Sequence, residues 1–312
     1  MHTDKIKGML FGAAAAATYG MNPLFALPLY HQNISTDSVL FYRYSIAVAV
    51  LGAWMKLSGQ SMKITKKEIL PLIIGGVTFA FSSLLLFDSY NYMAAGLAST
   101  LLFVYPVMVA LIMAGFFKEK LTAVTIISIT LALIGIALLY QGDGEQKLSV
   151  TGVVLVLLSA LAYAVYIVGV NKSCLKNIPT EKLTFYVILA GLSVFIVRLN
   201  FGTALQPIQS VSAAASAVAL AVLPTVVSLI CTAKAIHYVG ATPTAILGAL
   251  EPVTAVFFGT IIFHEPLTAR LLLGIIVIIA AVTLIVSGQS VSSGINRLFR
   301  RTDLKNIKNL RG

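Results

Sequence analysis

The chain has 312 residues, of which 58% are hydrophobic and only 11% are charged, and its mean hydropathy is +0.94. A soluble domain carries roughly a quarter charged residues, so this composition excludes a soluble protein and predicts a protein embedded in a bilayer. The formal net charge of +11 does not indicate nucleic-acid binding, because the lysines and arginines lie between apolar runs and in the C-terminal tail. Membrane topology explains that distribution better.

Ten apolar runs of about 20 residues, the length that spans a bilayer as a helix, follow one another along the chain. The first run resembles a secretory signal, because Lys5 and Lys7 precede it, but its counterpart in the second half predicts that it is retained. We therefore predict an all-α membrane protein with ten transmembrane helices. The predicted spans are 7–27, 38–57, 69–92, 96–117, 122–140, 150–171, 181–200, 213–237, 242–263 and 268–288.

The second half of the chain repeats the first. The segment AAGLASTLLFVYPVMVALIMAGFFKEKLT (94–122) aligns without a gap with GATPTAILGALEPVTAVFFGTIIFHEPLT (240–268). This alignment superposes Pro106 on Pro252, and internal repeats of this length indicate duplicated structural units. The sequence predicts a single domain over 1–312 that contains homologous repeats at 7–140 and 150–288.

The basic residues of the loops predict how the chain is oriented. Cytoplasmic loops carry an excess of Lys and Arg, and ten helices place most of these residues on one side of the membrane. The opposite loops carry only Lys147, Arg198 and Arg270. Both termini are therefore predicted to be cytoplasmic. The cytoplasmic group consists of Lys5, Lys7, Lys56, Lys63, Lys66, Lys67, Lys118, Lys120, Lys172, Lys176, Lys182 and the tail.

Each half holds five predicted spans, an odd number, so the halves cross the membrane in opposite senses. Such an inverted-topology repeat of five plus five helices is typical of secondary transporters, which bind substrate near the midplane between the halves. Segment 141–146 (QGDGEQ) is expected to be an external linker. The basic segment 290–312 is expected to be a cytoplasmic tail, which either lies on the anionic inner leaflet or only enforces the topology.

The fourth and ninth spans carry a family resemblance. LFVYPVMVALIMAGFFKEKLT and LGALEPVTAVFFGTIIFHEPLT each hold a central proline and end in a glutamate, Glu119 or Glu265, with Leu-Thr one residue further on. Over about 7–288 the chain resembles the EamA family of the drug/metabolite transporter superfamily. The resemblance implies a bacterial inner-membrane carrier, often an exporter of amino acids or other small metabolites. It also implies a central cavity lined by helices one, three, four, six, eight and nine.

Glu251 is the most informative polar residue, because a carboxylate at the centre of an apolar span is expensive and should face a cavity or the bundle interior. It is predicted either to contact a substrate amine or to couple transport to protons; the alternative is a support for the backbone that Pro252 interrupts. Lys234, near the end of the eighth span, is predicted to reach Glu251 or a substrate carboxylate, or else to extend to the interface.

Aromatic and amide side chains complete the predicted substrate-binding wall. Tyr19 and Tyr163 are related by the repeat, Asn22 and Tyr166 lie one turn further on, and Tyr105 occupies in the first half the position of Glu251 in the second. Such groups suit a wall for a small polar or aromatic solute, although ordinary helix packing is an equal alternative.

Two charged residues are expected to lie near the external ends of their spans. Arg43 in the second span and Asp88 in the third are predicted to form a gating or structural ion pair, with direct substrate contact as the alternative. The prolines Pro106 and Pro252 are predicted to break helices at the transport site, together with Pro23 and Pro224.

No motif indicates catalysis or a cofactor. His2, His31, His237 and His264 have no metal-site spacing, and phosphate loops and nucleophile motifs are lacking in the sequence. Cys174 and Cys231 are expected to be unpaired. The expected protein is a non-enzymatic secondary carrier of a small-molecule substrate in the lipid bilayer, with proton coupling and a monomeric or homodimeric state left open. The alternative is a channel or scaffold, but a channel would show rings of like polar groups.

Overall fold

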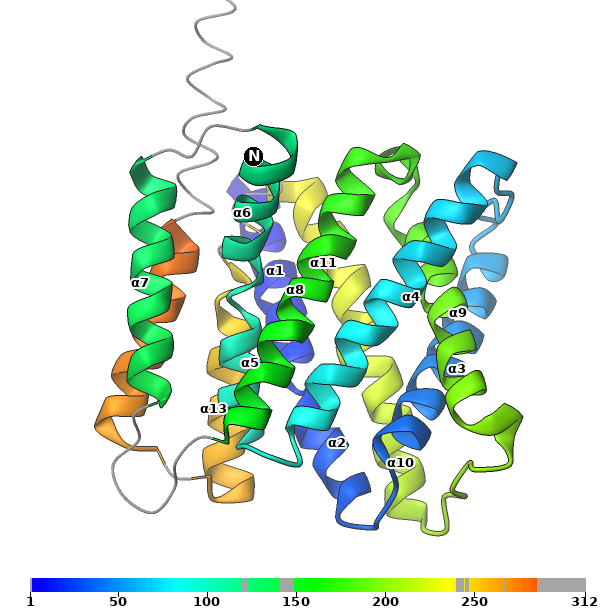
Figure 1. Ribbon diagram of the computed structural model, residues 1–312. Coiled ribbons are helices and arrows are strands. Elements are labelled where there is room, and N and C mark those ends of the chain that lie inside the picture. Colours follow the sequence, from blue (N-terminus) through cyan, green and yellow to red (C-terminus); the bar gives the residue numbers. More distant parts are fainter. Residues whose placement is uncertain are drawn as a thin grey trace, which may run out of the picture.

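The computed structural model describes residues 2–118, 123–140, 149–239, 244, 247–265 and 267–284, and helices dominate these residues. Figure 1 shows them as a bundle of roughly upright helices joined at two ends. In the first half the helices are α1 (His2–Gly20), α2 (Asn22–Tyr30), α3 (Thr36–Leu57), α4 (Lys66–Ser89), α5 (Ala95–Leu102), α6 (Tyr105–Phe117) and α7 (Ala123–Tyr140).

The second half follows the same order. Its helices are α8 (Val150–Lys172), α9 (Thr180–Arg198), α10 (Val211–Ala221), the π-helical turn η3 (Val222–Val227), α11 (Ser228–Val239), α13 (Leu250–Phe263) and a last helix at Ala269–Leu284. Short 3₁₀ turns follow α8 and α9 as η1 (Cys174–Asn177) and η2 (Asn200–Gly202).

All ten predicted runs contain helix. Among the described residues, seven helical segments are long and apolar enough to cross a membrane: Asp4–Tyr30, Thr36–Leu57, Lys66–Ser89, Ala95–Phe117, Val150–Lys172, Thr180–Arg198 and Val211–Val239. Three shorter apolar helices, Ala123–Leu138, Leu250–Phe263 and Ala269–Leu284, occupy the remaining runs. The protein is therefore an all-helical, multi-pass membrane protein. Segments 141–146 and 290–312, the predicted linker and tail, lie outside the described residues.

Several helices are interrupted near a proline. The first span breaks at Met21, two residues before Pro23, and the fourth breaks between α5 and α6, where Pro106 occupies the first turn of α6. In the eighth span Pro224 lies within η3. A proline cannot donate the helical hydrogen bond and its ring displaces the preceding turn, so each break follows from the local sequence.

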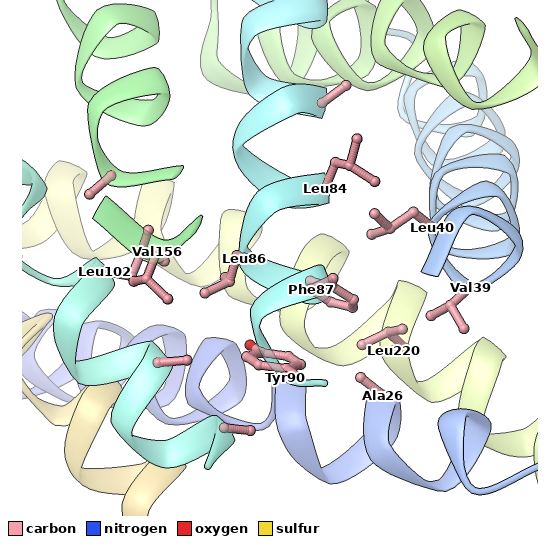
Figure 2. Packing of buried hydrophobic residues seen from close by; sticks show 14 of the residues in the cluster. Ala26, Val39, Leu40, Leu84, Leu86, Phe87, Tyr90, Leu102, Val156 and Leu220 are labelled. Carbon is pink, nitrogen blue, oxygen red and sulfur yellow. The ribbon is translucent and has the colours of Figure 1, made fainter. Parts of the chain in front are cut away.

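Helices from the two halves pack against one another. α4 contacts α8 and α9, α1 contacts α11 and α13, and α5 contacts α13. Figure 2 shows part of the buried apolar packing, where Phe87 and Tyr90 meet Leu220 of α10 and Ala26 of α2. Because lipid is as apolar as these side chains, close packing and hydrogen bonds between helices hold the bundle together.

Candidate functional site

A cavity of about 280 Å³ lies between the two halves. Both halves contribute to its wall through α1, the break between α5 and α6, α8, α11 and the first turn of α13. The described lining residues are Gly12, Ala15, Ala16, Tyr19, Leu102, Phe103, Tyr105, Tyr163, Ser228, Leu229, Thr232, Ile236, Thr244, Gly248 and Glu251.

The cavity extends toward the end of the bundle at which α1 begins. Its lining follows α1 back from Tyr19 to Gly12 and α11 onward from Ser228 to Ile236. Tyr19 and Glu251 are therefore at its inner end. The cavity therefore runs from Tyr19 and Glu251 toward the side of the chain's N-terminus.

Glu251 contributes the carboxylate of the inner end. It lies in the first turn of α13, where the positive end of the helix dipole stabilises a negative charge. Gly20 of α1 allows the close approach, because a Cβ there would lie 2.5 Å from the carbonyl oxygen of Glu251. Pro252 has no N–H to donate to the carbonyl of Gly248, four residues earlier. That carbonyl instead accepts the backbone N–H of Glu251 at 2.9 Å. Supporting that carbonyl therefore does not require the side chain of Glu251.

Three tyrosines line the cavity together with this carboxylate. Tyr105 and Tyr163 form an edge-to-face pair with ring centroids 4.7 Å apart. Tyr19 of α1 lies in the same wall. Phenol rings and hydroxyls around one carboxylate form a wall that offers stacking surfaces, hydrogen bonds and a counter-charge to a small solute.

Two of the predicted wall residues lie outside the lining. Tyr166 packs behind the wall, with its ring 6.0 Å from that of Tyr163 and 5.3 Å from that of Phe79. Asn22 is buried, and its Nδ2 donates to the Tyr19 carbonyl at 2.9 Å. Because Tyr19 lies four residues before Pro23, its carbonyl lacks a helical donor, and the Asn22 amide replaces that donor.

The predicted contact between Lys234 and Glu251 is not formed. Lys234 is exposed, and its ammonium group lies 5.0 Å from the centre of the Phe11 ring. The face of α11 that lines the cavity carries Thr232 and Ile236. Each is two residues from Lys234 in the sequence, so the Lys234 side chain lies about 200° around the helix from them. Lys234 therefore points away from the cavity.

The predicted ion pair between Arg43 and Asp88 is also wrong for this structure. Arg43 is buried, and its Nε donates to Thr225 Oγ1 at 3.1 Å while its guanidinium lies 5.1 Å from the centre of the Phe87 ring. Phe87 faces Arg43, and successive residues of a helix point about 100° apart. The neighbouring side chain of Asp88 therefore points in a different direction from Arg43.

Asp88 instead lines a second pocket of about 410 Å³ at the end of the bundle where α3 begins. Asp37, another lining residue, forms an ion pair with Arg198, with the Nε and the carboxylate 2.6 Å apart. Among the described residues, no group of three His, Cys, Asp or Glu side chains is placed to hold a metal ion. This pocket therefore has no feature that identifies a ligand.

The sequence interpretation missed the polar residues that α11 contributes to the cavity. Ser228 and Thr232 are one helical turn apart and continue to Ile236 on the same face. The spacing of four residues is visible in the sequence and would have identified one helix face. On its own, however, such a stripe is equally typical of contact between helices.

Comparison with known proteins agrees with this architecture. The family model described as the EamA-like transporter family matches residues 6–141 and again residues 150–287. The chain belongs to the EamA-like transporter family. Membership confirms the resemblance and makes this protein a multi-pass membrane member of a transporter family.

Relatives of this EamA-like chain are named as transporters without a stated substrate. The uncharacterized transporter YxxF of Bacillus subtilis is 27% identical over 55% of this chain and 56% of its own length, so the chain spans little more than half of that relative. The uncharacterized transporter YdfC of the same organism is 26% identical over 67% of this chain and 68% of its own length. A crystal structure aligns with a TM-score of 0.64 over 89% of this chain and 95% of that chain, at 16% identity, which supports the fold alone.

Proposed function

We propose that this protein is a secondary transporter that moves a small metabolite, such as an amino acid, across the bacterial inner membrane by alternating access. Ten transmembrane helices would form an inverted repeat of five plus five, with both termini in the cytoplasm and export as the direction of transport. The observation that carries this proposal is the cavity between the halves, with the carboxylate of Glu251 in its wall.

The packing of the helices supports a two-fold repeat, which exchanges the first span with the sixth and the third with the eighth. The contact of α1 with α11 then has its counterpart in that of α8 with α4, and both contacts occur. Two further pairs of contacts are related in the same way. The contact between α1 and α13 corresponds to the contact between α8 and α6. The contact between α3 and α10 corresponds to the contact between α9 and α4. Two halves that exchange in this way can rock about a central site.

Individual hydrogen bonds follow the same relation. Ser82 Oγ of α4 donates to the Ser159 carbonyl of α8 at 3.0 Å, and Ser228 Oγ of α11 donates to the Ala15 carbonyl of α1 at 2.9 Å. Ser82 and Ser228 are equivalent in the repeat, as are Ala15 and Ser159. These paired bonds support equivalent interfaces on the two sides of the cavity.

The helix ends that follow the proline breaks are also equivalent. Lys118 ends α6 and His264 ends α13, and both residues adopt a left-handed conformation with φ of 54°. The backbone N–H of Lys118 donates to the Met113 carbonyl, and that of His264 donates to the Gly259 carbonyl. The same cap at two non-glycine residues supports a common ancestry of the two halves.

The charge of the cavity supports a carrier rather than a channel. Among the described lining residues Glu251 is the one charged group, whereas an ion channel shows rings of like charged groups. With the N-terminus in the cytoplasm, the structure would be open to the cytoplasm and closed to the outside.

Glu251 is proposed either to bind an amine of the substrate or to carry a proton, and one variant distinguishes the two roles. Glu251→Gln retains the size and one acceptor oxygen but cannot ionise. If Glu251 binds substrate, binding and exchange in proteoliposomes fall together; if it couples to protons, exchange persists and accumulation driven by a pH gradient is lost.

Glu181→Gln is the matched control, because Glu181 is a half-buried carboxylate in the first turn of α9 that does not line the cavity. It should leave binding, exchange and proton-driven flux unchanged. A Glu251→Gln protein that is fully active in all three assays would remove Glu251 from the site. A wild-type protein that moves no solute from a broad panel of metabolites would count against the carrier function itself.

A further inference from the structure

Glu265 forms a contact that the cavity does not explain. It follows α13 by two residues and lies at the end of the bundle at which α5 begins. Its Oε1 accepts the backbone N–H of Ala95 at 2.8 Å, and its Oε2 accepts that of Gly96 at 3.2 Å. The carboxylate thus binds both N–H groups at the start of α5, where the helix dipole favours a negative charge.

Two glycines make room for this carboxylate. A Cβ at Gly96 of α5 would lie 3.0 Å from Glu265 Oε2, and a Cβ at Gly259 of α13 would clash with the same oxygen. The Glu265 backbone N–H also donates to the Gly259 carbonyl at 3.0 Å. The glutamate is therefore inserted between the two helices from the ninth and fourth spans rather than lying over their surface.

Burial raises the pKa of the Glu265 carboxyl, and the two amide groups of α5 oppose that shift because they stabilise the ionised form. If α5 moved away from α13, the carboxylate would be hydrated instead, and each lost hydrogen bond would be replaced by one to water.

The position of this contact relates it to the cavity. α5 begins at Ala95, which Glu265 contacts, and ends at Leu102, a lining residue. α13 carries Glu251 in its first turn, at the inner end of the cavity, and leads to Glu265. α5 and α13 come from different halves and pack against one another at this end of the bundle, where α2 also contacts α10 and α13. Separation of α5 from α13 is one movement that would open the cavity toward this end.

We propose that Glu265 is the latch that keeps the cavity closed on the side at which α5 begins, and that it releases when the cavity opens to that side. Glu265 is a positioning residue: it does not touch the cavity, and it acts by holding α5 on α13. This inference rests on the proposed alternating access and adds a specific contact that must break during it.

The test measures access to the cavity from each side. A reporter cysteine replaces Ala16, a lining residue, in a protein with Cys174→Ser and Cys231→Ser, and a membrane-impermeant maleimide is added to intact cells or to inverted vesicles. A second reporter, Thr203→Cys, identifies the side on which α5 begins, because Thr203 is exposed in the turn that follows α9 at the same end.

With Glu265 intact, the Ala16→Cys reporter should react slowly from the side of α5. Glu265→Ala removes both hydrogen bonds to the start of α5 and should raise that rate roughly tenfold or more, since the loss of even one hydrogen bond to a charged group shifts an equilibrium by about that factor. Glu265→Gln, which keeps one acceptor oxygen, should give an intermediate rate. Gly96→Ala, whose methyl group would displace the carboxylate, should act in the same direction as Glu265→Ala.

Asp37→Asn is the control, because it breaks the ion pair with Arg198 at the same end of the bundle without touching α5 or α13. The proposal would be overturned if Asp37→Asn raised the labelling rate as much as Glu265→Ala does. It would also be overturned if Glu265→Ala raised the labelling rate equally from both sides, because either result would indicate a general loosening of the bundle. The proposal would be overturned as well if Glu265→Gln and Gly96→Ala both fold, as judged by a monodisperse purified protein, and both leave the labelling rate of the Ala16→Cys reporter unchanged. The labelling measurement needs no identified solute. If Glu265 variants change the labelling rate as expected while the wild-type protein transports no solute that is tried, the result contradicts the carrier function and not the role of Glu265.

Discussion

Arg43 illustrates how one buried charge is accommodated in this bundle. Only 4% of its surface is exposed, and a cation inside a membrane span is costly unless other groups solvate it. Thr225 Oγ1 accepts from its Nε and the Phe87 ring lies beneath the guanidinium. Thr225 belongs to the π-helical turn η3, so this bond also connects α3 to the break in the eighth span.

Replacing Thr225 tests that connection. Thr225→Val keeps the shape of the side chain but removes the acceptor of the Arg43 Nε, and a hydrogen bond to a charged group contributes about 1.5–3 kcal/mol. The detergent-solubilised variant should therefore unfold at a lower temperature than the parent protein.

Thr78→Val is the matched control for this variant. The Thr78 hydroxyl is exposed and donates to the Ile74 carbonyl within α4, so its removal leaves no buried charge unpaired. Equal melting temperatures for the two variants would show that the bond between Arg43 and Thr225 does not stabilise the bundle.

Among the helices, close approach at glycines decides which faces meet. A Cβ at Gly76 of α4 would lie 2.5 Å from Ala190 Cβ and 2.6 Å from the Val187 carbonyl oxygen, both in α9. A Cβ at Gly169 of α8 would meet no atom within 4 Å. Both glycines lie in helix interiors, so the difference between them is one of packing between helices.

This contrast predicts opposite effects of the same substitution. Alanine in place of glycine within a helix ordinarily stabilises by about 0.5–1 kcal/mol. Gly169→Ala should therefore be neutral or stabilising in thermal unfolding, whereas Gly76→Ala should destabilise because α4 and α9 must move apart. A Gly76→Ala protein as stable as Gly169→Ala would contradict the close contact of α4 with α9.

The whole molecule has two ends that differ in charge, and this difference bears on its orientation. Lys56, Lys63, Lys66 and Lys67 lie in and around the connection between α3 and α4, at the end where α1 begins. An excess of basic residues in short loops is typical of the cytoplasmic side. The proposed orientation therefore places the cavity entrance in the cytoplasm.

Labelling of exposed positions tests the orientation. In a protein without its two native cysteines, Lys66→Cys should react with an impermeant maleimide only in inverted vesicles. Thr203→Cys, at the opposite end, should react only in intact cells. The reverse pattern would overturn the orientation, and reaction of both from one side would contradict the number of spans between them.

Local features of the sequence predicted much of the fold. Each of the ten runs chosen by hydrophobic length contains helix, and the breaks in the first, fourth and eighth spans lie near a proline, because both signals act over a few residues. The repeat and the cost of a buried carboxylate directed attention to Tyr19, Tyr105, Tyr163 and Glu251, and these four residues line the cavity. A buried charge must be satisfied wherever the chain folds, so its importance is visible in the sequence.

The chain's amino-acid order by itself determined that this is an all-helical membrane protein, since apolar length depends on neighbouring residues alone. Only the tertiary structure decided which way each side chain faces. Lys234 and Asp88 lie on the correct helices but point away from their predicted partners, because one residue turns a helix by about 100°. Packing between distant helices sets that rotation, and the same packing brings Glu265 to the start of α5.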